Sequence, residues 1–338
     1  MAGEKIGFVG LGLMGHGMAK NLVEKGWPLA VLAHRNREPI EDLISRGAQE
    51  ARTARELALR SEIVVLCVTG SPQVESVITG RDGLATAGQP LLIIDCSTSD
   101  PSVTTRLAAE LAPKGITLID APLGRTPKDA WEGALDVMVG GEPAAVARAR
   151  PVLEAFARRI IPTGAIGTGH TMKLLNNFLS MGYAALYSEA LILGAKTGLT
   201  PQVFDSVIRD GRMDCGFYRT FFQYVLERDR DAHKFSLRNG LKDVTYLASL
   251  ANASGVANPL GAAVRNSFAL AVGSGHGDDY VPMLSDIVAR LNGISLTNSP
   301  SAPPHIYQPN RQAHPVAAYP SSTPHCPAAA ASLHVPTE

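Results

Sequence analysis

The sequence Gly10-Leu-Gly12-Leu-Met-Gly15 directly follows an apolar run at residues 6–9 and leads into an amphipathic segment at residues 14–25. Where this pattern connects a strand to a helix, its first glycine permits a tight turn and its second lets backbone amides approach a pyrophosphate. The third lets the helix pack closely against the strand. Alone, the pattern also fits an ordinary glycine-rich turn, but the flanking strand and helix predict a dinucleotide site. The cofactor-binding residues predicted there are Gly10, Gly12, Leu13, Met14 and Gly15.

Apolar runs alternate with amphipathic segments through the first half of the chain. The runs expected to form strands are residues 6–9, 29–32, 63–68, 91–94 and 118–119, and helices are expected at 14–25, 38–46 and 102–114. Strands that are apolar throughout suit a parallel sheet covered by helices on both faces. The pattern predicts an α/β domain with a doubly wound parallel sheet over residues 1–164. A strand at 135–139, a helix at 143–156 and a strand at 159–162 complete it.

The strand pattern disappears after about residue 169, and helical periodicity continues to about residue 296. The first helix is expected over 171–197, with Gly198 as the glycine that ends it and Pro201 in the first turn of the next. We therefore expect residues 165–296 to form an all-α domain for substrate binding and dimerisation. Small residues on the long helix pack either within the monomer or across a dimer: Ala184, Ala185, Ala190 and Ala195.

Composition limits the function classes. A length of 338 residues suggests about two domains, and 31 basic against 31 acidic residues give zero net charge, so no broad basic surface is available for nucleic acid or an anionic membrane. A content of 45% hydrophobic residues supports a buried core. Residues 297–338 hold nine of the 23 prolines and four of the nine histidines. We expect a disordered tail there, because the histidines are too widely spaced for a metal-binding tract.

The four cysteines lack the close spacing of a zinc site or a disulfide framework. We expect no metal, and a reducing, cytoplasmic location. The N-terminus has no basic segment followed by an apolar one, and no run of about 18 apolar residues suggests a membrane span.

The choice between NAD and NADP depends on the residues after the second strand, Ala33-His-Arg35-Asn36-Arg37. NAD sites usually place a carboxylate there to bind the ribose hydroxyls, whereas an arginine pairs with the 2′-phosphate of NADP. The sequence favours NADP, with Arg35 as the contact. The alternative is that Arg35 and Arg37 are solvated loop charges and that either dinucleotide binds.

Small hydroxyl residues follow the fourth strand in Asp95-Cys-Ser97-Thr98. Ligands lie at the carboxyl edge of open α/β sheets, so Thr98 is a candidate to contact nicotinamide or substrate. In the alternative interpretation, Ser97 or Ser99 caps the helix that begins near Pro101.

The long helix carries an unusual polar group within an apolar stretch: Lys173, Asn176, Asn177 and Ser180. Asn177 and Ser180 lie four and seven residues after Lys173, on the same helical face. Burying a lysine costs free energy unless partners compensate, which indicates a catalytic role. The alternative is a lysine that extends to solvent at the surface.

These motifs resemble the β-hydroxyacid dehydrogenase family, the group of 3-hydroxyisobutyrate dehydrogenase and tartronate semialdehyde reductase. The resemblance covers about residues 5–296. It rests on the cofactor glycines, Asp95-x-Ser97-Thr98, Asp120-Ala-Pro, Gly169-x-x-x-Lys173-x-x-Asn176-Asn177 and Lys242-Asp243. It implies a Rossmann domain followed by a helical domain, assembled as a homodimer or homotetramer. It also implies that Lys173 is catalytic, that Asn177 orients the substrate, that Thr98 lies at the nicotinamide and that Lys242 closes over the cofactor. Asp243, next to Lys242 in that motif, is a further substrate-binding candidate.

One departure concerns the substrate. Most members have Ser-Gly-Gly where this chain has Gly124-Arg125-Thr126. This triplet, together with Asn176 and Ser180, resembles the sulfolactaldehyde reductase branch, in which the arginine, the first asparagine and the serine hold a sulfonate. A guanidinium fork, an amide and a hydroxyl match the three acceptor oxygens of that group. The acidic NAD-type residue of that branch is not evident here.

The sequence therefore predicts an NAD(P)-dependent oxidoreductase for a small anionic aldehyde or 3-hydroxy acid. Reduction of 3-sulfolactaldehyde is the first candidate, and oxidation of 3-hydroxyisobutyrate or reduction of tartronate semialdehyde is the alternative. An imine reductase of the same fold is disfavoured by Lys173. A hypothesis of another class is a non-catalytic dinucleotide-binding module that contacts a protein partner through its tail.

Overall fold

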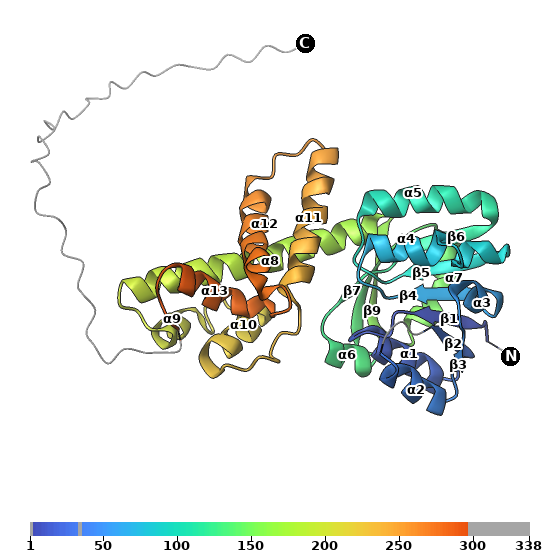
Figure 1. Cartoon of the computed structure of the whole chain (residues 1–338), viewed down its shortest axis with the longest axis horizontal. Coiled ribbons are helices and arrows are strands. Elements are labelled where there is room, and N and C mark those ends of the chain that lie inside the picture. Colours follow the sequence, from blue (N-terminus) through green and yellow to red (C-terminus); the bar gives the residue numbers. More distant parts are fainter. Residues whose placement is uncertain (1–2, 33–35, 297–338) are drawn as a thin grey trace, which may run out of the picture.

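The computed structural model describes residues 3–32 and 36–296 of the chain. It contains a sheet domain and a helical domain, connected by the long helix α8 (Thr168–Lys196), which starts at the sheet and runs the length of the helical domain (Figure 1). The predictions for Arg35 and for a disordered tail at 297–338 fall outside the described residues.

The first domain is built on a nine-stranded sheet. Its strands are β1 (Ile6–Val9), β2 (Leu29–Leu32), β3 (Gln49–Glu50), β4 (Ile63–Leu66), β5 (Leu91–Asp95), β6 (Ile116–Asp120), β7 (Leu123–Gly124), β8 (Leu135–Gly140) and β9 (Ala157–Gly164). Strands β3-β2-β1-β4-β5-β6 are parallel in that order, which is the order of dinucleotide-binding sheets. The fold prediction is confirmed, although β8 joins β6 and β7 antiparallel. The pattern missed β3 and β7, which are only two residues long.

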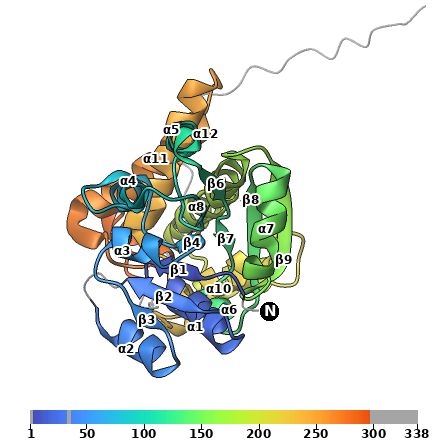
Figure 2. The same cartoon turned by 90° about the vertical axis from the view of Figure 1, so that its right-hand side faces the viewer.

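Helices cover both faces of this sheet (Figure 2). They are α1 (Gly15–Glu24), α2 (Glu38–Ser45), α3 (Ala54–Leu59), α4 (Ser71–Thr79), α5 (Pro101–Leu111), α6 (Pro127–Trp131) and α7 (Pro143–Leu153). On one face α1, α2 and α7 enclose a core around Phe8, and on the other α3, α4 and α5 enclose a second core around Ile93. Burial on both sides explains why the central strands β1, β2 and β4 carry no polar side chain.

The second domain is helical, as predicted. Beside α8 it contains α9 (Pro201–Ile208), α10 (Gly216–Glu227), α11 (Leu237–Ala253), α12 (Pro259–Ala271) and α13 (Leu284–Leu291). These helices enclose a third core, rich in aromatic side chains such as Phe221, Phe222 and Phe268. Helix α8 ends at Lys196, Gly198 follows with φ +96°, and Pro201 starts α9, so the predicted end and restart are confirmed.

Helix α8 is long and apolar enough, by length and composition, to pass a test for a membrane-spanning helix. The central helix of a packed core passes the same test, and α8 buries Met181 and Leu191 in the core of the helical domain. Of the small residues expected at an interface, Ala184 and Ala185 pack inside the monomer, whereas Ala190 is exposed. The opposite side of α8 carries large exposed apolar side chains.

Candidate active site

The glycine loop between β1 and α1 has the geometry that a dinucleotide requires. Gly10 has φ +99°, and a Cβ there would lie 2.2 Å from the carbonyl oxygen of Cys67. A Cβ on Gly15 would lie 1.9 Å from the carbonyl oxygen of Gly10. Gly12 borders open space, and α1 begins without a side-chain cap or an acidic residue in its first turn. The amides at this helix terminus are therefore available to an anion such as a pyrophosphate.

The loop after β2 is described only from Asn36 onward. Arg37 pairs with Glu50, with 2.6 Å between Nη1 and Oε1, and its side chain is 54% exposed. Arg37 thus has an acidic partner within the protein. The basic contact proposed for the cofactor rests on Arg35, outside the described residues.

Asp95, at the carboxyl end of β5, organises the loop that contains Thr98. Its Oδ1 accepts a hydrogen bond from the Ser97 backbone N–H at 2.9 Å, and its Oδ2 accepts one from the Ser99 hydroxyl at 3.1 Å. Helix α5 is capped by Asp100, which accepts from the backbone N–H of residue 102. The alternative that Ser97 or Ser99 caps this helix is therefore wrong, because Asp100 is the N-cap, the Ser97 hydroxyl accepts from the Val68 N–H and the Ser99 hydroxyl donates to Asp95.

Helix α11 docks on the loops that follow β4 and β5. The Lys242 ammonium donates to the carbonyl oxygen of Thr98 at 2.9 Å and to that of Thr69. One turn later, the Tyr246 hydroxyl accepts from the backbone N–H of Ser71 at 3.3 Å. Lys242 and Thr98 are thus in direct contact at the carboxyl edge of the sheet, where ligands of such sheets bind. Thr98 makes this contact through its backbone.

Asp243 connects Lys242 with the polar face of α8. The Asn177 amide donates to Asp243 Oδ2 at 2.6 Å, and Lys242 Nζ lies 3.1 Å from Asp243 Oδ1. Asp243 is 1% exposed. Its carboxylate therefore faces two site residues rather than solvent, and it holds the Asn177 amide in one orientation.

Lys173 lies one turn before Asn177 and is half-buried. Burial lowers the pKa of the Lys173 ammonium; the Asp243 carboxylate opposes that shift and the Lys242 ammonium adds to it. On the same helix, the Ser180 hydroxyl donates to the Asn176 carbonyl at 3.1 Å. The structure thus brings together Lys173, Asn177, Lys242 and Asp243 from two helices, with Asn176 and Ser180 on the adjoining turns of α8.

Arg125 belongs to a different group of contacts. Its Nη1 lies 2.5 Å from Asp129 Oδ1, and its Nε lies 3.6 Å from Asp136 Oδ2. The Thr126 hydroxyl donates to the other oxygen of Asp129, and Gly124 pairs with Asp136 in the sheet. Arg125 also has φ +80°, a region that favours glycine. The two carboxylates therefore hold a guanidinium on a strained backbone.

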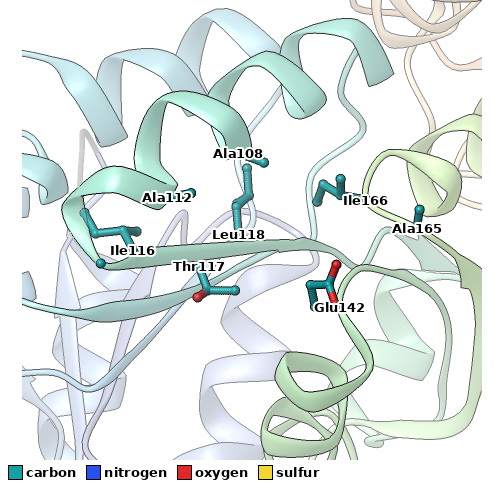
Figure 3. Close-up of a pocket in the computed structure, with 9 residues that line it drawn as sticks. Ala108, Ala112, Ile116, Thr117, Leu118, Glu142, Ala165 and Ile166 are labelled. Atoms are coloured by element: carbon teal, nitrogen blue, oxygen red, sulfur yellow. The ribbon is translucent and has the colours of Figure 1, made fainter.

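Two surface hollows lie elsewhere. One of about 320 Å³ is lined by α5, β6 and the turn between β9 and α8, mostly with Ala, Ile and Leu side chains and with Glu142 at one side (Figure 3). The other, of about 380 Å³, lies between α11 and α12. Neither lining includes a predicted site residue. Within residues 3–32 and 36–296, no group of three or more His, Cys, Asp or Glu side chains is arranged to hold a metal ion.

The sequence motifs do not indicate a role for three residues of this region: Tyr246, Asp95 and Asp120. Tyr246 follows Lys242 by four residues, which places both on one helical face and is the signal that identifies it. Asp95 and Asp120 each end an apolar strand, at an edge where polar side chains are expected to serve a site.

This combination of a dinucleotide-binding sheet with a lysine and an amide at its carboxyl edge defines an NAD(P)-dependent dehydrogenase or reductase. A sequence profile for the NAD binding domain of 6-phosphogluconate dehydrogenase matches residues 5–167. A profile for the NAD-binding of NADP-dependent 3-hydroxyisobutyrate dehydrogenase matches residues 167–285. The chain belongs to the β-hydroxyacid dehydrogenase family, which confirms the resemblance seen in its motifs.

Individual relatives cover most of the chain. A 3-hydroxyisobutyrate dehydrogenase of Pseudomonas aeruginosa is 37% identical over 273 residues, which are 78% of this chain and 91% of the relative. A 3-sulfolactaldehyde reductase of Escherichia coli is 31% identical over 284 residues, 83% of this chain and 95% of the relative. The crystal structure of a 3-hydroxyisobutyrate dehydrogenase from Salmonella typhimurium superposes with a TM-score of 0.76 at 27% identity, covering 84% of this chain and all of that one. The relatives differ in substrate, so they leave the substrate of this chain unresolved.

Proposed function

We propose that the protein interconverts a small anionic aldehyde of three or four carbons and the corresponding hydroxy acid, with NADP as the preferred dinucleotide. Reduction of 3-sulfolactaldehyde to dihydroxypropanesulfonate is the first candidate reaction. The observation that carries the proposal is the cluster of Lys173, Asn177, Asp243 and Lys242 at the carboxyl edge of the sheet.

Lys173 is the proton donor of the proposed reduction. When bound at the glycine loop, the dinucleotide supplies a hydride to the carbonyl carbon, or accepts one in the reverse direction. The Lys173 ammonium then delivers a proton to the carbonyl oxygen as negative charge develops there. The pKa of Lys173 is lowered towards neutral pH. A group whose pKa is nearer to the working pH can both donate and accept the proton, as the two reaction directions require.

Asn177 and Lys242 position the reacting groups. Asp243 accepts from Asn177 Nδ2, so that amide is held in place without any contribution from the substrate. Lys242 spans the carbonyl oxygens of Thr69 and Thr98, and thereby closes α11 against the two loops beside the nicotinamide position. Asp243, Asn177 and Lys242 thus hold one another in place on two helices. Side chains that are already in position need less rearrangement before the reaction.

Arg125, Asn176 and Ser180 are proposed to hold the anionic group. The ion pairs of Arg125 use Nη1 and Nε, and its side chain is 33% exposed, so the described contacts leave Nη2 without an acceptor. A sulfonate has an acceptor oxygen for each of the three groups. A carboxylate substrate is the second candidate, supported by the two acidic partners that already compensate the guanidinium charge and by the 37% identical 3-hydroxyisobutyrate dehydrogenase.

A substrate panel tests this proposal. The purified protein is assayed with NADPH and NADH on 3-sulfolactaldehyde, tartronate semialdehyde, a phosphorylated aldehyde and an uncharged aldehyde of equal length. We expect the highest kcat/KM for the sulfonate with NADPH. A higher value for the carboxylate assigns the protein to the second candidate. Turnover of the uncharged aldehyde alone, or of none, contradicts the proposal, and binding of dinucleotide without turnover supports the non-catalytic alternative.

Assembly into a homodimer or homotetramer is part of the proposal. Large apolar side chains on α8 remain exposed, among them Leu179 at 58%, Leu186 at 63% and Leu193 at 68%. They are spaced by seven residues, which places them on one side of the helix and makes a continuous apolar strip. Such a strip is typical of an interface with another protein surface. Sedimentation of the wild type and of Leu186→Glu tests it, because the charge should dissociate the oligomer.

A further inference from the structure

A buried polar network lies where α8 meets the sheet. Asp95 and Asp120 end the neighbouring strands β5 and β6 and are register partners. His170, in the first turn of α8, lies between them, and Thr104 of α5 closes the network. All four side chains are at most 2% exposed. Buried polar groups of this kind usually have a positional or chemical task, because burying them costs free energy.

Asp120 binds the N-terminus of α8. Its Oδ1 accepts from the backbone N–H of Gly167 at 2.8 Å, and its Oδ2 accepts from that of His170 at 2.7 Å. The first N–H groups of a helix lack acceptors within the helix, and Gly167 at the N-cap position has no side chain to supply one. A carboxylate from β6 thus replaces the usual side-chain cap, at the end of the helix that attracts negative charge.

Two glycines make room for this carboxylate. A Cβ on Gly140 would lie 2.8 Å from Asp120 Oδ1, and a Cβ on Gly169 would lie 2.8 Å from Asp120 Oδ2. Gly169 also faces the carbonyl oxygen of Met138, at 2.7 Å from such a Cβ. Any side chain at these positions would displace the carboxylate or the helix, so the close approach depends on glycine.

His170 links the anchor to the neighbouring strand. The Thr104 hydroxyl and His170 Nδ1 share a hydrogen bond at 2.8 Å, and the same hydroxyl lies 3.2 Å from the Asp100 carbonyl oxygen. His170 Nδ1 lies 3.9 Å from Asp120 Oδ2, and Nε2 lies 3.8 Å from Asp95 Oδ2. Within the described part of the chain, Nε2 has no hydrogen-bond partner. The imidazole ring thus separates the two carboxylates.

The two aspartates serve the two sides of the candidate active site. Asp95 holds the loop that contains Thr98 through Ser97 and Ser99, whereas Asp120 holds the turn that precedes Lys173. Lys173 follows His170 by three residues, one helical turn. Any shift of this turn relative to the sheet edge therefore moves the lysine relative to Thr98.

We propose that Asp120 and His170 are positioning residues, which hold Lys173 in register with the loop beside the nicotinamide. Both side chains are fully buried, so they act on the site through the backbone and side chains that they hold. The inference rests on the proposed function in one respect, because it takes Lys173 as the proton donor. The anchoring of α8 by Asp120 is a property of the fold and is measurable without substrate.

Hydrogen–deuterium exchange tests the anchor first. The variants are Asp120→Asn, which keeps one acceptor oxygen, Asp120→Ala, which keeps none, and His170→Phe, which keeps a buried ring. Thr200→Ala is the matched control, since Thr200 caps α9 through the Val203 N–H in the same domain and lies outside the site. In peptides covering residues 167–173, we expect exchange to be slowest in the wild type, faster in Asp120→Asn and fastest in Asp120→Ala. Unchanged exchange there, or equal acceleration in Thr200→Ala, overturns the anchor.

Kinetics then separate a positioning role from a merely structural one. In the full-length enzyme we expect kcat to fall by about tenfold or more for Asp120→Asn and His170→Phe, because small misplacement of a catalytic group is costly. Dinucleotide affinity should stay within about twofold, and the primary isotope effect with deuterated dinucleotide should rise as the misaligned chemical step becomes rate-limiting. A fall in kcat with an unchanged isotope effect indicates loss of active protein and overturns the positioning role.

The two proposals fail in different ways. If the wild type turns over no anionic aldehyde or hydroxy acid, the proposed function fails, and the exchange data still decide whether Asp120 anchors α8. If the wild type is active and the variants retain its kcat and isotope effect, the positioning role fails while the proposed function stands. If Asp120→Ala does not fold, Asp120→Asn and His170→Phe carry both measurements.

Discussion

Substitution of Arg125 distinguishes the two candidate substrates. Because the residue has a positive φ, two variants that differ only in how well they tolerate that backbone conformation can be compared. Arg125→Ala and Arg125→Gly both remove the guanidinium, and with it the ion pairs to Asp129 and Asp136. They differ in how well they tolerate φ +80°, which is favourable for glycine and unfavourable for alanine. Comparing them separates the loss of the charged group from the effect on the backbone.

The expected magnitudes follow from these contacts. A charge-assisted hydrogen bond to an anion contributes about 1.5–3 kcal/mol. Since each 1.4 kcal/mol is a factor of ten, kcat/KM on the anionic substrate should fall roughly ten- to a hundredfold in both variants. For stability, the partly exposed ion pairs contribute roughly 0–1 kcal/mol. Alanine in the left-handed region costs roughly 1–2 kcal/mol of folding free energy. Glycine avoids this cost but loses more backbone entropy on folding, which reduces its advantage by about 0.5–1 kcal/mol.

The assay compares kcat/KM on sulfonate, carboxylate and uncharged aldehydes of equal length, beside denaturant unfolding of the same preparations. We expect similar kinetic losses in both variants on the anionic substrate, a much smaller loss on the uncharged aldehyde, and a glycine variant about 0.5–1 kcal/mol more stable than the alanine variant. The double change Gly124→Ser with Arg125→Gly restores the common family pattern and should move the preference from sulfonate towards carboxylate.

Equal losses on charged and uncharged substrates would refute this reasoning. Arg125 would then be a structural residue that pairs with Asp129 and Asp136, and the sulfonate assignment would be withdrawn in favour of the carboxylate substrates of the family. Kinetic losses that track unfolding stability, with alanine worse than glycine on every substrate, would lead to the same conclusion.

Three further predictions concern the proton donor and the cofactor. Lys173→Ala should lower kcat by about a hundredfold or more, in line with general acid catalysis, with dinucleotide affinity retained in a fluorescence titration; near-normal turnover would exclude the mechanism. Asp243→Asn removes a negative charge that raises the pKa of Lys173, and because reduction needs the ammonium form, the alkaline limb of the kcat profile should move to lower pH. A limb that moves to higher pH would show that a group other than Lys173 titrates. Arg35→Asp should shift the kcat/KM preference from NADPH towards NADH, and an unchanged ratio would mean that Arg35 does not contact the ribose.

Much of the site was predictable because its residues lie on regular elements. The glycine pattern after an apolar run identified the dinucleotide loop, and the spacing of Lys173 and Asn177 placed both on one helical face. The role of the serines after β5 was not predictable in the same way. Ser97 and Ser99 have the side chains of helix caps, but the contact that decides their role comes from Asp95.

By itself, the sequence predicted the alternation of the longer strands and helices, the dinucleotide loop and Lys173 as the candidate lysine, because these depend on local periodicity and on short motifs. Only the tertiary structure decided which charges meet. Asp243 lies 66 residues from Asn177 and Lys242 lies 144 residues from Thr98, and the packing of α11 against α8 and the sheet edge brings both pairs into contact. Asp120 likewise acquires its task only when β6 ends beneath the first turn of α8. Hydrogen bonds and ion pairs form only between groups a few ångströms apart in space. The sequence therefore shows which polar groups are present, and the fold determines which of them are in contact.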